Sequence, residues 1–263
     1  MNRIAFLATL LMLTLILVGS SGHAQELGQP QPFSEKGNIT LGLGYYYYQS
    51  EWETNNPDME PGNVMQNYIH AVVSYGFVEN WEGYIMLGVA DQVAEEAFPF
   101  DTPADLEDGF KPNAAVGFRG LLYKTPTFGL GPIFHAGIYS SYEDEKEGTI
   151  TVPGVGAIPA TISQKTTDTW DVNVGLGLQY DLEKVLIYGA PFYYMAKAKG
   201  EGTITTPVGV EEICAEGEEK NNMGGLVGIT FPLGEEIKVN LEGQYKSDIS
   251  FSAFISKSFN LGK

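Results

Sequence analysis

Seven ionisable residues have side chains that could carry chemistry, and all seven stand in segments where apolar and polar residues alternate. They are two basic residues, three acidic residues and two histidines: Arg119, Lys238, Glu82, Asp171, Glu242, His70 and His135. Carboxylates buried beside an arginine or a lysine form salt bridges, whereas hydrated charges line a pathway for ions. A histidine close to a carboxylate or a hydroxyl can act as a general acid or base. These residue types therefore leave a structural network, a conducting lumen and a catalytic site open.

The stretch from Asn67 to Asp91 indicates how such residues are positioned. It contains two alternating runs separated by the short turn 77–80, and each run puts its larger apolar residues on one face. Period-two alternation predicts a strand with one apolar and one polar face. His70 lies opposite Ile69 and Ala71, and Glu82 lies opposite Ile85 and Leu87. Both runs have the length of a tilted transmembrane strand, which needs roughly 9 to 11 residues. We interpret this hairpin as the repeating unit of a membrane β-barrel.

Residues 1–24 have the pattern of a secretory signal peptide. Arg3 precedes an apolar run from Ile4 to Val18, and Gly22-His23-Ala24 places small residues at the positions that a signal peptidase reads. The alternative is a retained transmembrane anchor. Cleavage after Ala24 would leave a mature chain of 239 residues with 14 basic and 33 acidic residues. So acidic a chain repels nucleic acid. The single cysteine, Cys214, permits no internal disulfide.

Ten strands can be counted in the mature chain. The expected ranges are 38–51, two strands within 67–91, and 113–123, 131–142, 169–180, 185–197, 222–231, 237–245 and 249–259. Short turns alternate with long connections at 52–65, 91–112, 143–168 and 199–221. Short turns are typical of the periplasmic side and long loops of the cell exterior. We therefore predict an all-β fold, a transmembrane antiparallel up-and-down β-barrel of about ten strands over residues 38–263, with long acidic outer loops.

Residues 25–37 are polar and contain proline, so we expect a poorly ordered periplasmic lead-in. The first strand then carries four consecutive tyrosines, Tyr45 to Tyr48, which we interpret as part of an aromatic girdle at a membrane interface.

The chain resembles the outer-membrane β-barrel superfamily of Gram-negative bacteria over roughly residues 38–259. The resemblance rests on the signal peptide, the alternating strands, the hairpin YGFVENWEGYIMLG and a last strand that ends in Phe259. It implies residence in the outer membrane and contact with its lipid, with lipopolysaccharide and with the barrel-insertion machinery. It implies no single activity, because barrels of this size include adhesins, small channels, proteases and lipid-modifying enzymes.

The inward-facing charges favour a salt-bridged network that fills a narrow lumen, in which Arg119 and Lys238 lie among Glu82, Asp171 and Glu242. We therefore expect a non-enzymatic surface or structural protein. A narrow porin-like channel for ions or small solutes is the alternative. An outer-membrane protease or lipid-modifying enzyme is a further one, although His70 and Ser74 lie about 13 Å apart along a strand. A soluble calyx would have an apolar interior, the reverse of the pattern expected in lipid.

Two further expectations concern the long connections. They carry 21 Asp or Glu residues and five Lys, which predicts a solvated acidic surface with possible weak binding of divalent cations and no other cofactor. The heptapeptides 147–153, EGTITVP, and 201–207, EGTITTP, resume the alternation beyond charged residues. We predict that both strands continue past the membrane and fold back as rim hairpins, with Cys214 in the second return arm at the cell exterior.

Overall fold

The computed structural model describes residues 27–55, 62–152, 154, 156–219, 222–234 and 236–260. The expected signal peptide, residues 1–24, lies outside the described residues. No helix in these ranges is long and apolar enough to cross a membrane.

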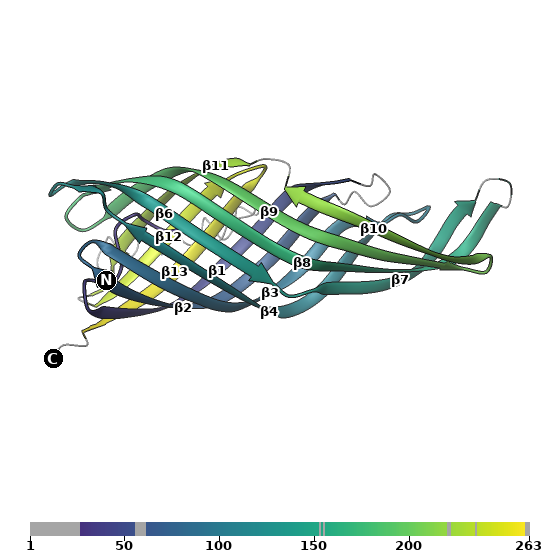
Figure 1. Cartoon of the computed structure of the whole chain (residues 1–263), viewed down its shortest axis with the longest axis horizontal. Coiled ribbons are helices and arrows are strands. Elements are labelled where there is room, and N and C mark those ends of the chain that lie inside the picture. Colours follow the sequence, from purple (N-terminus) through teal and green to yellow (C-terminus); the bar gives the residue numbers. More distant parts are fainter. Residues whose placement is uncertain are drawn as a thin grey trace, which may run out of the picture.

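Ten long strands pair with antiparallel neighbours in a closed ring (Figure 1). In order around the ring they are β1 (Asn38–Thr54), β2 (Asn63–Val78), β3 (Trp81–Phe98), β4 (Ala104–Gly120), β6 (Phe128–Tyr139), β8 (Gly156–Asp181), β9 (Leu186–Thr206), β11 (Met223–Pro232), β12 (Ile237–Tyr245) and β13 (Ile249–Asn260). The ring closes where β1 pairs with β13, from Asn38 opposite Asn260 to Tyr47 opposite Phe251. The predicted ten-stranded up-and-down barrel is confirmed.

The connections at one end of the barrel are short. Asn80 in the β2–β3 turn and Glu183 in the β8–β9 turn have φ angles of 62° and 66°, in the left-handed region that tight turns require. The two-residue strand β5 (Tyr123–Lys124) pairs with β6 at this end. The first residue of β1 and the last residue of β13 lie here too, so this end corresponds to the expected periplasmic side.

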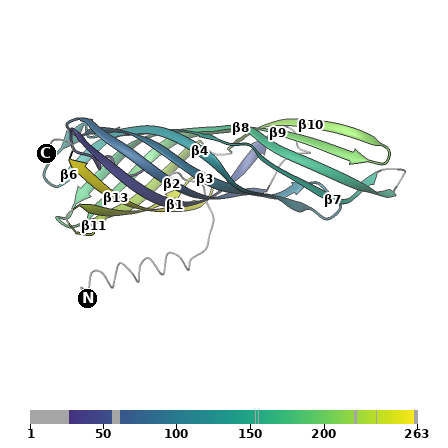
Figure 2. The same cartoon turned by 90° about the horizontal axis from the view of Figure 1, so that it is seen from below.

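At the opposite end, strands continue far beyond the other elements (Figure 2). β8 has 26 residues and β9 has 21. β7 (Tyr142–Val152) runs outward and pairs with β8, which returns to the barrel, whereas β10 (Gly209–Glu219) is the strand that returns along β9. The predicted rim hairpins are confirmed. The interpretation of 143–168 and 199–221 as loops is wrong, because nearly all their described residues are paired in strands. We call β7, β10 and the parts of β1–β4, β8 and β9 on this side of the barrel the outer extension.

Two bulges mark the boundary between the barrel and the outer extension. One lies in β8 between Thr167 and Trp170, and the other lies in β4, where Asp108 and Lys111 oppose Gln92 and Ala90. Each bulge adds a residue to one strand and therefore changes which alternate positions face inward.

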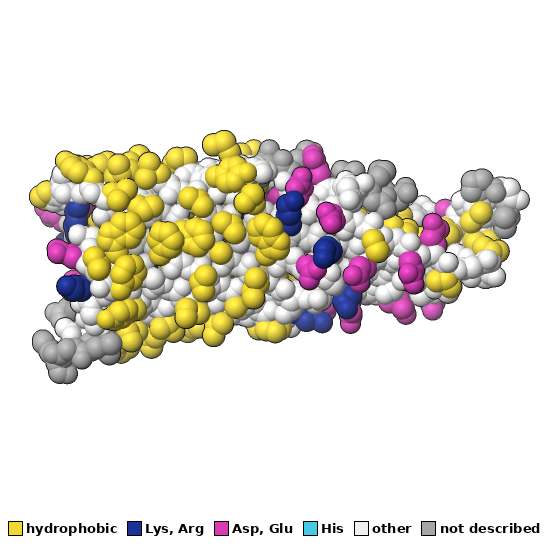
Figure 3. Space-filling view, viewed as in Figure 1, with side chains coloured by type: hydrophobic (Ala, Val, Ile, Leu, Met, Phe, Trp, Pro, Cys, Tyr) yellow, Lys and Arg dark blue, Asp and Glu magenta, His cyan; other side chains and the backbone are white. Residues whose placement is uncertain are grey.

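Large apolar side chains cover the outside of the barrel below these bulges (Figure 3). Leu43, Ile85 and Leu87 expose 62%, 56% and 61% of their surfaces, more than water-facing apolar side chains normally do in groups. Charged side chains begin where this belt ends (Figure 3). The belt is what a hydrocarbon layer requires of the outer surface of a barrel. Of the four tyrosines expected in a girdle, Tyr45 faces this belt and Tyr46 is buried inside the barrel.

Candidate functional site in the barrel lumen

Residues 27–36 run inside the barrel at the end with the short turns. Leu27, Phe33 and Ser34 expose 1%, 3% and 1% of their surfaces. The expectation of a poorly ordered lead-in is therefore wrong for these residues. Their order comes from polar side chains on the inner wall, to which backbone groups of the segment are bonded. We call residues 27–36 the inner plug.

Glu242 on β12 holds the start of the inner plug. Its two carboxylate oxygens accept hydrogen bonds from the backbone N–H groups of Leu27 and Gly28, at 3.0 and 2.9 Å. Tyr188 Oη donates a third hydrogen bond to Glu242 at 2.8 Å. Bonds from N–H groups to an ionised acceptor are among the stronger hydrogen bonds in proteins. Glu242 thus binds the backbone of the plug instead of a basic side chain.

Arg119 and Glu82 form a buried ion pair beside the plug. The guanidinium Nε lies 2.7 Å from Glu82 Oε1, and Nη1 donates to the Leu27 carbonyl oxygen at 3.3 Å. The other Glu82 oxygen accepts a hydrogen bond from the Ser34 backbone N–H at 2.8 Å. The guanidinium also stacks 4.7 Å from the centre of the Phe33 ring. The predicted pair therefore fastens the plug at two points as well as filling the lumen.

Gly28 shows how closely the plug and Arg119 fit together. Its φ is +72°, and a Cβ atom at this position would lie 1.9 Å from Arg119 Nη1. Both the backbone conformation and the space therefore require glycine.

The remaining predicted carboxylate and lysine do not join this network. Asp171 accepts hydrogen bonds from Tyr139 Oη at 2.9 Å and from the Asn173 amide, on the side of the lumen nearer the outer extension. The Lys238 ammonium is 6.0 Å from the centre of the Phe33 ring, with only part of the side chain buried. The inner plug connects Glu242 to the Arg119–Glu82 pair through Leu27, whereas Asp171 is bonded to Tyr139 and Asn173 instead of a basic side chain.

The two histidines are buried in the lumen wall, as their alternation predicted. His135 Nδ1 lies 3.1 Å from Tyr84 Oη, and His70 stacks between Tyr68 and Phe254 with ring centres 5.0 and 6.2 Å away. Neither ring nitrogen of His70 has a hydrogen-bond partner among the described residues. The rings fill space, and each lies against aromatic side chains.

Sequence reasoning missed a second ion pair, at the outer end of the lumen. The Lys246 ammonium lies 3.8 Å from Glu219 Oε2 and 3.9 Å from the centre of the Tyr194 ring, with both charged side chains buried. Lys246 belongs to the three-residue β12–β13 connection and Glu219 ends β10, so no alternation pointed to either residue. A cavity of about 20 Å³ next to this pair is also lined by Asp171.

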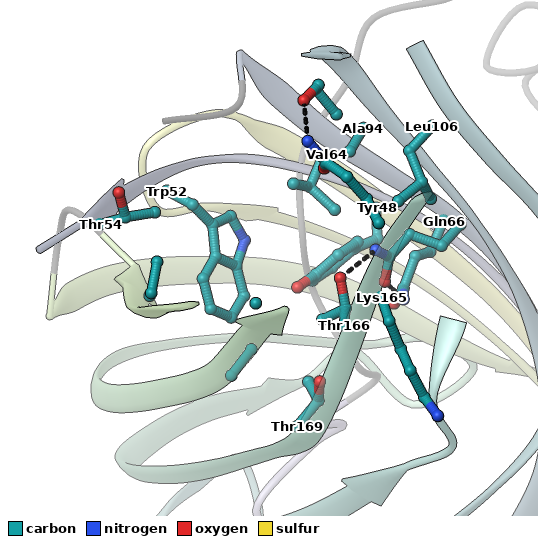
Figure 4. Close-up of a pocket in the computed structure, with 17 residues that line it drawn as sticks. Tyr48, Trp52, Thr54, Val64, Gln66, Ala94, Leu106, Lys165, Thr166 and Thr169 are labelled. Atoms are coloured by element: carbon teal, nitrogen blue, oxygen red, sulfur yellow. Dashed lines mark hydrogen bonds between the residues drawn. The ribbon is translucent and has the colours of Figure 1, made fainter. Parts of the chain in front are cut away.

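A larger cavity, which we call the outer cavity, lies above this ion pair inside the outer extension (Figure 4). It has a volume of about 80 Å³, and its wall includes Tyr48, Trp52, Gln66, Ala94 and Thr166. Trp52 is part of a buried apolar cluster that also contains Val64, Ala94 and Leu106. The outer cavity and the smaller one share Tyr48, Trp52, Gln66 and Thr169.

Among the described residues, no group of three or more His, Cys, Asp or Glu side chains is placed to hold a metal ion. The exposed carboxylates of the outer extension are spread along paired strands, where several accept hydrogen bonds from backbone N–H groups. Asp108 and Asp144, for example, accept them from Glu143 and Glu107.

No family model matches the chain, and no curated protein matches it. Among solved structures, the outer-membrane protease OmpT from Escherichia coli has 11% identity and a TM-score of 0.48, covering 84% of this chain and 96% of that one. The translocator domain of the autotransporter NalP from Neisseria meningitidis has 11% identity and a TM-score of 0.43, covering 86% and 89%. The Pseudomonas putida toluene transporter TodX has 8% identity and a TM-score of 0.43, covering 92% and 95%.

The class of this protein follows from its own architecture. A closed antiparallel ring of ten strands, an apolar outer belt and a lumen with many buried polar side chains define a transmembrane β-barrel.

Proposed function

We propose that the chain is exported through a cleaved signal peptide to the outer membrane, where it is a non-enzymatic surface protein with a closed lumen. The observation that carries this proposal is the pair of hydrogen bonds from Leu27 and Gly28 to Glu242, which ties the inner plug across the lumen. The belt contacts outer-membrane lipid, and the outer extension stands among lipopolysaccharide. The barrel-insertion machinery would place the chain in this membrane.

The plug is held by buried charges, which makes spontaneous opening costly. If the plug left, Glu242 would lose two backbone donors and Glu82 would lose one. A hydrogen bond to a charged group contributes about 1.5 to 3 kcal/mol to stability. The closed lumen is therefore expected to be the resting state.

Conductance across a planar bilayer tests the closed lumen. We expect the refolded mature chain to give no steady current and a variant lacking residues 27–34 to give a stable open level. Lys36→Ala, at an exposed position of the same segment, is the matched control and should stay closed. Heat-modifiable migration on a gel verifies that each variant is folded. Equal steady currents from the mature chain and the deletion variant would contradict the proposal.

A narrow channel is the second candidate. It is favoured by the outer cavity and the smaller cavity below it, which share four wall residues and extend from the outer extension to the Lys246–Glu219 pair. A current in the mature chain whose ion selectivity changes in Arg119→Ala would support this candidate over a closed lumen.

The orientation of the barrel can be tested with the native thiol. Cys214 lies exposed on β10 in the outer extension. We expect a membrane-impermeant thiol reagent to label it on intact cells, with Cys214→Ser as the unlabelled control. Labelling that begins only after the outer membrane is breached would mean that the outer extension faces the periplasm.

A further inference from the structure

The outer extension encloses a buried apolar cluster of its own, separate from the two clusters in the barrel lumen. Trp52, Val64, Ala94 and Leu106 are each at most 8% exposed, and they come from four successive strands. Around the outer cavity, several inward positions hold only small side chains. These are Ala94, Ala97, Ala198, Gly200, Ala215 and Gly217. The small residues leave a space where larger apolar side chains would otherwise meet.

Two buried polar groups on the cavity wall have no hydrogen-bond partner in the part of the chain that the structure describes. Trp52 is 8% exposed, and its indole Nε1–H has no acceptor among the described residues. Figure 4 shows this nitrogen on the side of the ring that faces Tyr48 and Thr166. The Thr169 hydroxyl, on the wall of the same cavity, also has no partner there. Buried N–H and O–H groups are nearly always paired, so these two indicate that something else supplies an acceptor.

The polar amides of the cavity wall are already engaged. Gln66 Nε2 donates to Gln92 Oε1 at 3.2 Å, and Gln92 Nε2 donates to Thr166 Oγ1 at 3.4 Å. Gln164 Nε2 donates to the Ala97 carbonyl oxygen. Among the described residues of this wall, the Trp52 indole is therefore a free donor, and its N–H has a fixed direction in the plane of the ring.

The charges near the outer cavity are paired with one another. The Lys165 ammonium pairs with Glu143 at 3.7 Å, and both side chains are exposed. The Lys246 ammonium below the cavity pairs with Glu219. Lys165 contributes to the cavity wall, so an ionised ligand would have to compete with these existing ion pairs for a counter-charge, which is unfavourable.

We propose that the outer cavity binds a compact, uncharged, ring-containing molecule whose single oxygen acceptor takes the hydrogen bond from Trp52 Nε1. The apolar body of the ligand contacts Tyr48, the Trp52 ring and the small side chains. The cavity volume of about 80 Å³ restricts the ligand to a small molecule. This inference goes beyond the closed lumen, because the site is the same whether or not the barrel conducts.

The test compares three fluorinated probes of similar size by ¹⁹F NMR on the folded mature chain in micelles. 4-Fluoroacetophenone has a ring and one acceptor, 1-ethyl-4-fluorobenzene has the ring alone, and 4-fluorobenzoate carries a charge. Protein-free micelles correct for partitioning. One net hydrogen bond corresponds to about a threefold to tenfold difference in Kd. We expect the ketone to bind tighter than the hydrocarbon by that factor, and the benzoate not to bind.

Two substitutions locate the site. Trp52→Phe keeps the ring and removes the donor, so it should weaken ketone binding to the level of the hydrocarbon and leave hydrocarbon binding unchanged. Trp81→Phe, at the opposite end of β3 from the cavity, is the matched control and should change neither. Ala94→Leu fills the cavity and should abolish binding of both neutral probes.

Equal binding of ketone and hydrocarbon by the unmodified chain would overturn the role of Trp52. Binding of neither neutral probe above the micelle blank, or benzoate binding as tight as the ketone, would overturn the site. If Trp52→Phe does not fold, the comparison of the three probes on the unmodified chain and on Ala94→Leu decides the question.

Discussion

The barrel and the outer extension use the same strands with opposite patterns. Inside the belt the lumen combines buried polar side chains, such as those of His70, Asn173 and Gln179, with buried aromatic and aliphatic clusters, and the outer surface is apolar. In the outer extension the interior holds Trp52 and Ile162, and the outer surface is charged. The strand is the same structure in both regions, and the surrounding solvent decides which face is apolar. Lipid requires an apolar exterior, whereas water favours an apolar core.

The two bulges allow a continuous strand to serve both regions. On β8, Ile162 and Thr166 face inward before the bulge, and Thr169 and Asp171 face inward after it. On β4, Leu106 is buried on one side of the bulge and Asn113 on the other. Each bulge therefore changes which residues of its strand face inward, at the level where the apolar belt ends.

Arg119→Ala should produce the largest loss of stability, because it removes one member of a buried ion pair in the barrel lumen. Glu82 would lose its partner, and the inner plug would lose the hydrogen bond at Leu27. Such a break costs on the order of 3 to 5 kcal/mol. Urea unfolding in detergent measures the loss. The double variant Glu82→Ala/Arg119→Ala should recover part of it, and an unchanged midpoint for Arg119→Ala would exclude a role of the pair in stability.

A new charge on the outer surface compares the two regions directly. Leu87→Arg places a charge in the apolar belt, where it should cost roughly 2 to 4 kcal/mol near the membrane midplane. Thr205→Arg is the matched control on the outer extension, where the side chain is exposed to water. Unfolding from lipid vesicles should be easier for Leu87→Arg alone. Equal effects at both positions would mean that the belt does not mark the bilayer.

The Glu219 carboxyl on β10 should make stability depend on pH. Burial raises the pKa of Glu219 to about 7, although the nearby Lys246 ammonium acts to lower the pKa. The folded chain then binds a proton that the unfolded chain releases near pH 4.5, so stability should fall as pH rises from about 4.5 to about 7. Thermal unfolding between pH 5 and pH 8 measures this slope. Glu219→Gln should flatten it, and a slope that persists in Glu219→Gln would assign it to another group.

Removal of divalent cations should have the smallest effect. The carboxylates of the outer extension are spread along paired strands, and their hydrogen bonds to backbone groups need no metal ion. We expect the same protease sensitivity on intact cells with and without a chelator. Faster cleavage in the outer extension after chelation would instead indicate that cations bridge it to lipopolysaccharide.

Alternation predicted the barrel strands and the inward position of all seven singled-out side chains, since a strand has a fixed period of two. It could not predict the inner plug, because Leu27 reaches Glu242 across 215 residues and the plug has no periodic pattern. It also missed the apolar interior of the outer extension. The bulges at 108–111 and 167–170 change which residues of β4 and β8 face inward. An alternation that is continued through a bulge therefore assigns the residues beyond it to the wrong face.

The inner plug has a consequence for the order of assembly. The seam between β1 and β13 joins residues more than 200 positions apart, so it can close only after the last strand has arrived. The plug bridges this seam from inside: Ser34 Oγ donates to Thr40 Oγ1 on β1, and Ser258 Oγ on β13 donates to the Phe33 carbonyl oxygen. Separation of the two strands must therefore break the plug contacts as well as the strand ladder. The inner plug therefore slows the separation of β1 from β13 and gives the finished barrel kinetic stability.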